Sequence, residues 1–417
     1  MSEAGGSGAR LTDAQRLDWL RLIRTDSIGP QTFRGLINRF GGAAAALDAA
    51  PRIAAQKGRS LVLADLDACK REMDGLAAIG ARLIALGEPE YPKALRAINA
   101  PPPLLAVLGD VAVLSRPMVA VIGSRNASAA GLAFTERVVR DLAAAGFVIA
   151  SGLARGVDSR AHHASIGMGT VAALAGGLDR IYPPEHVGLA QDICARGALV
   201  SEMPLGWEPR GRDFPRRNRI VAGLALGTLV IEASRGSGSL ITAKYAADEG
   251  REIFAVPGSP LDPRAEGTNG LLRDGATLCT RAEDVLNVLL PMVEGGEPPL
   301  PLFREDESKG APEPLWDEFD LLYEVTVPTT VAGLAFDEPV RAAPAPAPAQ
   351  TPRAASQGPV VRVQVESLLG PSPVALDDLV RASGALVAEV RSALLDLELE
   401  GRLERHGGGM VSLLPKR

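Results

Sequence analysis

Cysteine is scarce in this chain: three occur among 417 residues, at Cys69, Cys194 and Cys279. Their number is odd and their spacing matches no metal-ligand pattern, so neither a disulfide framework nor a metal site is expected. We expect three buried thiols in the reducing cytoplasm.

Targeting and membrane segments are also missing. The start, Met1 to Gly6, has no basic and apolar signal region, and no apolar run approaches the length of a membrane span. We therefore expect a cytoplasmic protein without membrane contact.

An excess of positive charge is absent as well. The 44 Lys and Arg residues are outnumbered by 50 Asp and Glu residues, which gives a net charge of −6. Bulk charge would repel a nucleic acid, so any such binding requires a local basic groove.

Two common nucleotide-binding motifs are missing. Gly123 is followed by Ser124, Arg125 and Asn126 rather than by G-x-G-x-x-G. The loop Gly236-Ser237-Gly238-Ser239 lacks the lysine and the spacing of a Walker A sequence. These absences disfavour nicotinamide chemistry and P-loop hydrolysis.

The chain is nevertheless long enough for two or three domains. Residues 1–98 show helical spacing of apolar side chains and contain Ser27-Ile28-Gly29-Pro30, which resembles half of a helix-hairpin-helix. Such a hairpin can offer backbone N–H groups to phosphate, although Pro30 removes one donor. We expect a small helical domain, SAM-like or hairpin in type, with packing favoured over DNA contact.

Residues 99–290 alternate short apolar strands with amphipathic helices. The expected strands are Val119–Gly123, Val148–Ser151, Thr170–Ala175, Ala198–Glu202, Thr228–Glu232 and Ile253–Val256, and the expected helices include Ala133–Ala145, Ser159–Met168 and Ser239–Glu249. This alternation predicts an α/β core: a Rossmann-like, doubly wound, mostly parallel sheet with helices on both faces.

The remainder divides into a linker and a small domain. Residues 291–358 are rich in Pro and Ala and predict an extended linker. Residues 359–417 regain helical spacing and end in a two-stranded pattern around a glycine turn, which predicts a winged helix. Its expected recognition helix is acidic, with Glu389, Asp396, Glu398 and Glu400 against Arg391. Acids repel phosphates, so protein interaction is favoured over DNA binding.

Turns rich in small residues follow several of the expected strands. They are Gly123-Ser124-Arg125-Asn126, the segment from Ser151 to Asp158, Gly176-Gly177-Leu178-Asp179, and the segment from Ser234 to Ser239. Ligands bind beyond the carboxyl ends of strands in such a sheet, and helix N-termini there offer N–H groups to anions. With Arg125, Arg155, Arg235 and Lys244 beside them, the turns predict a phosphate-binding surface.

The most informative stretch is an arginine cluster headed by Phe214. Residues 210–219 hold five arginines, opposed by Asp213 alone, and run into an apolar helical segment. Arginine binds phosphate bidentately, and an aromatic ring can stack an unpaired base. The alternative interpretation is an intramolecular ion-pair network.

Six motifs in this order and spacing resemble the DNA-processing protein A family (DprA, also called Smf). They are Gly123-Ser124-Arg125, the segment Ser151–Asp158, the segment Phe214–Arg219, the loop Gly236–Ser239, Ala255-Val256-Pro257-Gly258 and Gly267-Thr268-Asn269. The resemblance covers about residues 100–290 closely and extends to the order of the three domains.

The resemblance implies a bacterial homodimer that binds single-stranded DNA, protects incoming DNA and loads the RecA recombinase in natural transformation, without catalysis or a cofactor. It assigns DNA contacts to Arg125, Ser151, Gly152, Phe214, Arg217, Asn218 and Arg219. The residue pattern adds Ser124, Arg155, Arg210, Arg212, Ser237 and Lys244. Many members place a lysine three residues before the phenylalanine, where this chain has Gly211.

Two other function classes remain open. Glu232 followed by the loop Gly236–Ser239 resembles the lysine-decarboxylase-like hydrolases of nucleoside monophosphates, but their Pro-Gly-Gly-x-Gly-Thr stretch is missing. A transcription regulator that binds duplex DNA through the winged helix is the third hypothesis, disfavoured by the acidity of that helix.

Several reactive-looking residues have simpler expected roles. His162 and His163 are adjacent in a helix and point to different faces, so packing is favoured over metal binding. Glu202 and Glu232 are expected to pair with nearby arginines, and Trp207 to anchor a loop.

Overall fold

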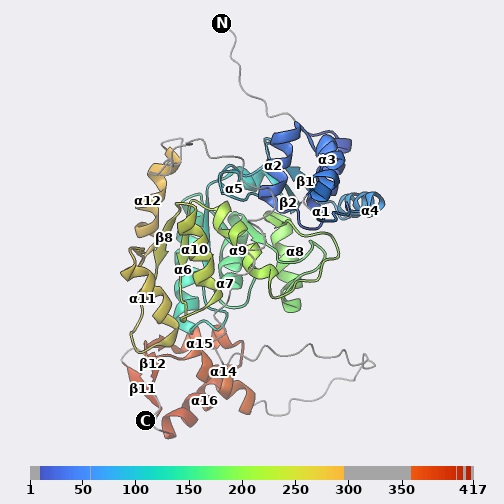
Figure 1. Cartoon of the computed structure of the whole chain (residues 1–417). Coiled ribbons are helices and arrows are strands. Elements are labelled where there is room, and N and C mark those ends of the chain that lie inside the picture. The colour runs from blue at the N-terminus through green and yellow to red at the C-terminus, as the bar shows by residue number, and fades with distance from the viewer. Residues whose placement is uncertain (1–9, 57, 295–357, 401, 407–409, 415–417) are drawn as a thin grey trace, which may run out of the picture.

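The computed structural model describes residues 10–56, 58–294, 358–400, 402–406 and 410–414. Figure 1 shows three parts in chain order: a helical N-terminal unit, a central sheet flanked by helices, and a small C-terminal unit beneath it. The predicted linker lies mostly at positions 295–357, outside the described residues.

The N-terminal unit is helical, as the spacing of apolar residues predicts. Its helices are α1 (Asp13–Arg24), α2 (Pro30–Phe40), α3 (Ala43–Gln56) and α4 (Leu66–Ala78). Thr12 and Gln15 form a capping box that starts α1, and Pro30 occupies the first turn of α2, where its missing N–H costs nothing. Phe33 packs edge-to-face against Trp19, with ring centroids 4.9 Å apart.

The core is a nine-stranded sheet in the order β1-β2-β6-β5-β4-β3-β7-β8-β9. Its strands are β1 (Arg82–Ala85), β2 (Leu104–Gly109), β3 (Met118–Ile122), β4 (Val148–Ser151), β5 (Thr170–Ala173), β6 (Ala198–Ser201), β7 (Gly227–Val230), β8 (Glu252–Ala255) and β9 (Thr277–Leu278). The six predicted strands are confirmed, with ends shifted by up to two residues, and they pair in parallel.

Two strands at one edge were not predicted. β2 pairs antiparallel with β6, and β1 pairs antiparallel with β2. β1 belongs to the range expected for the N-terminal domain, so the sheet begins before the expected boundary at residue 98. A four-residue strand between helices carries too short a pattern to be told from a helix end.

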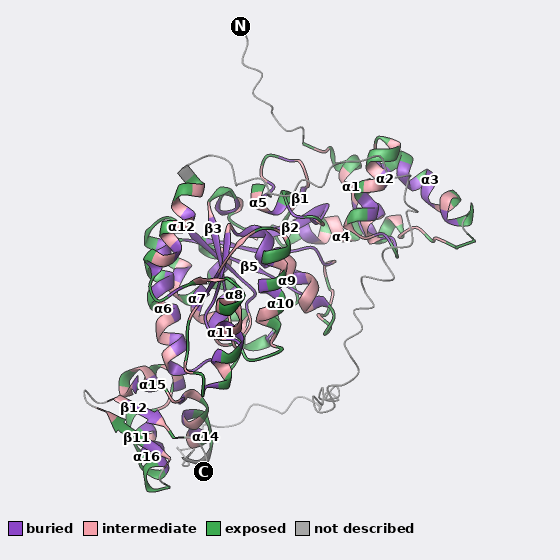
Figure 2. Ribbon diagram, turned by 60° about the vertical axis from the view of Figure 1, so that its left-hand side comes forward, coloured by how far each residue is buried: buried purple, intermediate pink, exposed green. Residues whose placement is uncertain are grey.

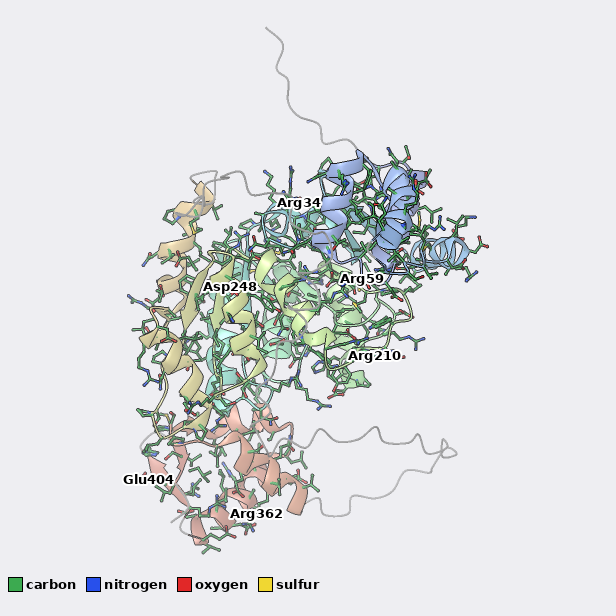
Figure 3. The ribbon with its side chains drawn as sticks, viewed as in Figure 1. Arg34, Arg59, Arg210, Asp248, Arg362 and Glu404 are labelled. Atoms are coloured by element: carbon green, nitrogen blue, oxygen red, sulfur yellow. The ribbon has the colours of Figure 1, made fainter. Side chains whose placement is uncertain are left out.

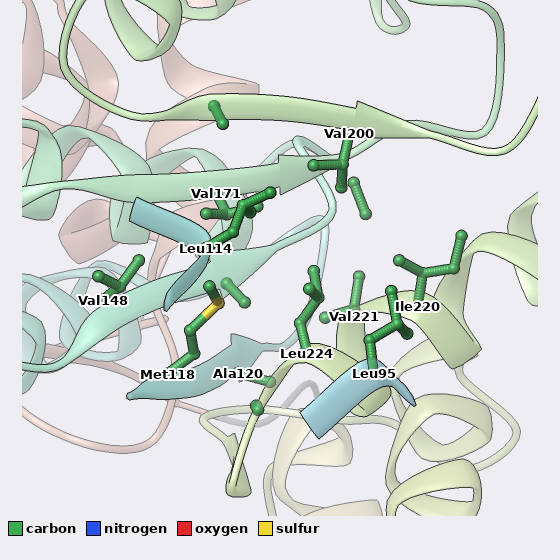
Figure 4. Packing of buried hydrophobic residues seen from close by; sticks show 14 of the residues in the cluster. Leu95, Leu114, Met118, Ala120, Val148, Val171, Val200, Ile220, Val221 and Leu224 are labelled. Atoms are coloured by element: carbon green, nitrogen blue, oxygen red, sulfur yellow. The ribbon is translucent and has the colours of Figure 1, made fainter. Parts of the chain in front are cut away.

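Helices cover both faces of the sheet, because successive strand residues point to opposite sides. They are α5 (Lys93–Arg96), α6 (Ala129–Ala144), α7 (Val157–Ser165), α8 (Val187–Arg196), α9 (Asp213–Leu224), α10 (Gly238–Asp248), α11 (Glu266–Arg273) and α12 (Ala282–Glu294). Ala120 belongs to the same apolar cluster as Leu224 of α9 (Figure 4). Val119 and Val121 belong to another cluster, which includes residues of α6. Figure 2 shows buried strands at the centre and half-exposed helices around them.

The C-terminal unit is the predicted winged helix. It consists of α14 (Gly358–Leu368), β10 (Val374–Ala375), α15 (Leu376–Ser383), α16 (Val387–Leu399), β11 (Leu403–His406) and β12 (Met410–Leu413), and β12 lies between the other two strands. The predicted glycine turn at 407–409 lies outside the described residues. Among the described helices, none combines the length and apolar character needed to cross a membrane.

The winged helix is docked on the core. Arg264 donates hydrogen bonds to the carbonyl oxygens of Ser367 (3.2 Å) and Leu369 (3.0 Å) at the end of α14, while Asp262 holds the same guanidinium at 3.1 Å. Ala129 at the start of α6 packs into the apolar cluster of the winged helix. The core therefore meets this unit through α6 and the loop before α11.

Candidate nucleic-acid interface

Three loops beyond the carboxyl ends of β3, β4 and β5 converge on the first turn of α9. Together they enclose a small cavity of about 30 Å³. Its lining residues are Arg125, Gly152, Ala154, Arg155, Tyr182, Pro183, Phe214 and Arg217. The structure thus brings two of the four expected strand-end turns, those of Arg125 and Gly152, next to Phe214 and Arg217 of the arginine cluster. The turns at 176–179 and 234–239 do not line this cavity. We call the cavity with these eight lining residues the arginine pocket.

The outer wall of the arginine pocket is aromatic and cationic. The Arg125 guanidinium lies over the Phe214 ring, 5.6 Å from its centroid, and Tyr182 meets the same ring edge-on at 5.4 Å. Tyr182 is 47% exposed, so about half of its surface is open to solvent. Sequence reasoning missed Tyr182, although it stands three residues after the strand-end turn Gly176–Asp179.

The floor of the arginine pocket is Arg217, which is 6% exposed. It donates hydrogen bonds to the carbonyl oxygens of Gly152 and Ala173, while its buried Nε has no partner among the described residues. Burial lowers the pKa of Arg217 to about 10, so it stays charged at neutral pH. The DNA contact expected of Arg217 stays a prediction; the structure shows a buried charge beneath the Phe214 ring and the Arg125 guanidinium.

Asp158 supports this floor. Its carboxylate accepts hydrogen bonds from the N–H groups of Gly152 (3.1 Å) and Ala154 (3.3 Å), which fixes the loop after β4. Burial raises the pKa of Asp158, and the charge of Arg217 opposes that shift. Gly152 is required here because a Cβ atom would overlap the Arg217 guanidinium.

Further arginines surround the pocket at the surface. Arg155 is exposed and pairs with Glu185. Arg210 lies over the Trp207 ring at 4.8 Å and projects from the surface of the core, as Figure 3 shows, and Arg212 is exposed just before α9. The Trp207 indole donates to Asp213 at 2.9 Å, which confirms its predicted role as a loop anchor.

Arg219 does not reach this surface. It forms an ion pair with Glu202 and donates to the carbonyl oxygen of Ala100 at 2.7 Å. Arg216 also pairs with Glu202, at 2.9 Å. Two of the five arginines of the cluster therefore form the ion-pair network that was the alternative interpretation, and a DNA contact of Arg219 stays a prediction. Burial favours the neutral acid, but the two arginines outweigh it and hold the pKa of Glu202 below its ordinary value.

The other expected contacts either stabilise the loops at the strand ends or lie along α9 and α10. Ser151 is fully buried and donates to the carbonyl oxygen of Val121 at 2.6 Å, so it holds β3 and β4 together, and a DNA contact of this residue stays a prediction. Ser124 accepts from the Asn126 N–H at 3.1 Å and shapes the first turn. Asn218, Ser237 and Lys244 lie along α9 and α10, where Asn218 donates to the Gly238 carbonyl at 3.4 Å and Lys244 is exposed.

Glu232 has a different partner from the one expected. Its carboxylate accepts hydrogen bonds from the N–H (2.9 Å) and the hydroxyl of Ser128, at the N-terminus of α6. The ion pair predicted for it is not observed among the described residues. Burial raises its pKa, while the Ser128 hydrogen bonds oppose the shift. A protein carboxylate thus occupies the helix N-terminus where a dinucleotide phosphate would otherwise bind.

Of the two adjacent histidines, His162 packs as predicted, whereas His163 is exposed. His162 is fully buried, its Nδ1 lies 2.8 Å from the Thr170 hydroxyl, and burial lowers its pKa to about 3. Within the described ranges, no group of three or more His, Cys, Asp or Glu side chains could hold a metal ion.

Three family models match the chain. DNA recombination-mediator protein A matches residues 82–290, a DprA-like N-terminal HHH domain matches 13–75, and a DprA winged helix domain matches 342–409.

Individual relatives agree with these matches. Protein Smf of Synechocystis is 33% identical over 329 residues, which are 77% of each protein. DNA processing protein DprA of Bacillus subtilis is 39% identical over 213 residues, covering 50% of this chain and 72% of that protein. The crystal structure of DNA processing protein A from Streptococcus pneumoniae superposes with a TM-score of 0.56 at 30% identity, covering 67% of this chain and 99% of that one.

Proposed function

Because the chain belongs to the DprA/Smf family, we propose that it binds single-stranded DNA across the arginine pocket, protects the strand and delivers it to the RecA recombinase in natural transformation. The resemblance expected from the ordered motifs is confirmed. Family members are DNA-binding processing proteins and not enzymes, so the hydrolase hypothesis is set aside.

The observation that carries the proposal is the combination of Arg125, Phe214 and Tyr182 on one exposed edge above the buried charge of Arg217. Successive phosphates would contact Arg125, Arg155, Arg210 and Arg212, while splayed bases stack on Tyr182 and Phe214. Stacking of this kind contributes about 1–3 kcal/mol per base. A duplex is disfavoured because its bases are already stacked and cannot reach the rings.

The remaining expected residues have supporting roles in this proposal. Ser124 and Gly152 shape the two turns that bring their backbones near the strand, and Ser151 and Arg219 hold those turns and α9 in place. Asn218, Ser237 and Lys244 would extend the path along α10. We further propose that the protein acts as a homodimer in the cytoplasm.

Fluorescence anisotropy tests the binding step. A labelled single-stranded oligonucleotide and its duplex would be titrated with the full chain across a salt series. Tight, strongly salt-dependent binding of the single strand and weak binding of the duplex are expected. Equal affinity for both, or no binding at low salt, would contradict the proposal.

The recombinase step needs its own measurement. RecA filament growth on single-stranded DNA coated with this protein should start sooner than on uncoated DNA. The proposed homodimer is tested separately, by sedimentation, which should give twice the mass of one chain. Normal DNA binding without faster filament growth would contradict the proposed loading of RecA and leave the proposed DNA binding intact.

A further inference from the structure

A second cavity, of about 470 Å³, lies between the core and the winged helix. From the core it is lined by the start of α6, by Ile231 and Glu232 after β7, and by the residues from Val256 to Ser259 after β8. The segment from Ser372 to Ala375, Asp378 and Met410 close it from the winged helix. Its volume suits a small organic molecule, and it shares no lining residue with the arginine pocket.

This cavity lies beyond the carboxyl ends of β3 and β7, where sheets of this type commonly bind ligands. From β3 the chain winds outward through β4, β5 and β6 and then returns to β7 on the other side of β3. The crevice between β3 and β7 is therefore the switch point of the sheet, where doubly wound folds bind ligands. A phosphate is excluded at its usual place, because Glu232 already occupies the N-terminus of α6.

One carboxylate in the cavity, that of Glu232, forms no ion pair with a described residue, although the charge of Arg264 acts on it from a distance. Asp262 pairs with Arg264 at 3.1 Å and Asp378 with Arg381 at 3.2 Å. Glu232 has only the Ser128 hydrogen bonds in the described part of the chain, so both of its oxygens keep lone pairs for another donor. Gly131 makes room for this carboxylate, since a Cβ atom there would lie 2.6 Å from its Oε1.

The rest of the lining is mainly apolar and includes one flat ring. Phe134, Val374 and Pro257 are all among the lining residues. The guanidinium of Arg137 lies over the Phe134 ring at 5.4 Å, so this ring already accepts a planar cation on one of its faces.

We propose that this cavity binds a small organic cation with a planar, N–H-rich head, an amidinium or guanidinium group, on an apolar body. The head would pair with the Glu232 carboxylate in bidentate fashion, and the body would lie between Phe134 and Val374. Because the roof belongs to the winged helix, the bound molecule would also hold that unit on the core.

Benzamidine is a suitable probe, with benzoate as the matched anion. Calorimetry on the full chain should detect saturable binding of benzamidine at one site and none of benzoate. Glu232→Gln should weaken benzamidine binding at least tenfold, because the amide removes the charge but can still accept a hydrogen bond from Ser128. Glu283→Gln, an exposed glutamate on α12, is the control and should bind as the unmodified chain does.

A second variant guards against a folding defect in Glu232→Gln. Ala133→Phe adds a side chain to the cavity from α6 and should abolish benzamidine binding while the melting temperature stays within a few degrees. Absence of benzamidine binding by the unmodified chain, or undiminished binding by both variants, would overturn the proposal. Single-stranded DNA affinity should be unchanged in both variants, which separates this site from the arginine pocket.

Discussion

The Arg125 guanidinium lies 5.6 Å from the centroid of the Phe214 ring, although Arg125 follows β3 and Phe214 opens α9. The contact places a guanidinium and an aromatic ring on one edge, where we propose that they bind a phosphate and stack a base. A nucleotide that bridges them would meet charge on its phosphate and an apolar face on its base. Each side chain can be removed separately, which gives distinct predictions.

Removal of the aromatic ring should lower affinity without changing the salt dependence. Phe214→Leu is expected to weaken single-stranded DNA binding by roughly 5- to 150-fold, since one base stack contributes about 1–3 kcal/mol. Tyr182→Leu should act in the same direction. Anisotropy at several salt concentrations measures both quantities. A changed salt slope in Phe214→Leu would mean that the substitution displaces Arg125.

Removal of the exposed charge should have the complementary effect. Arg125→Ala is expected to reduce the slope of log affinity against log salt by about 0.7, the value for one phosphate contact on a single strand. Arg137→Ala is the matched control, because Arg137 is also exposed and also lies over a phenylalanine, Phe134, outside the arginine pocket. If both variants change the slope equally, the arginine pocket is not the binding site.

A single methyl group should disrupt the floor of the arginine pocket. Gly152→Ala would place Cβ inside the Arg217 guanidinium, which has to leave its two carbonyl partners. We expect a lower melting temperature together with weaker DNA binding. In Gly188→Ala the new Cβ has no neighbour within 4 Å, so both quantities should be unchanged. Full DNA affinity in Gly152→Ala would show that the buried charge is dispensable.

The Glu202 network should contribute to stability and not to DNA binding. Glu202→Gln leaves Arg219 half-buried without its counter-charge and is expected to cost ~3 kcal/mol in unfolding free energy at neutral pH. Urea denaturation measures this cost, and DNA affinity serves as the internal control.

The ion pair between Glu202 and Arg219 should also make the free energy of unfolding depend on pH. The pKa of Glu202 is below its ordinary value of 4.5 in the folded protein, so its stabilising effect is complete above 4.5 and is lost as pH falls through the folded pKa. The difference in stability between the unmodified chain and Glu202→Gln should therefore shrink in that acidic range. A difference that stays constant there would mean that the charge of Glu202 contributes nothing.

The sequence by itself determined the core architecture and the family. Period-two apolar runs and helical spacing are local properties, so β3 to β8 and the helices between them could be assigned from residue patterns. The ordered glycine and arginine motifs likewise indicated which edge of the sheet carries the site, because parallel strands place all their carboxyl ends together.

Only the tertiary structure decided what each arginine does. Arg217 and Arg219 are two residues apart, yet one lies under the pocket and the other pairs with Glu202, since a helix turns them toward different neighbours. For the same reason Tyr182 lines the arginine pocket, Ser151 is buried between β3 and β4, and Glu232 pairs with Ser128 at the N-terminus of α6. Such partners are distant in sequence and adjacent only in the folded chain, so no local pattern encodes which of them a charged side chain will meet.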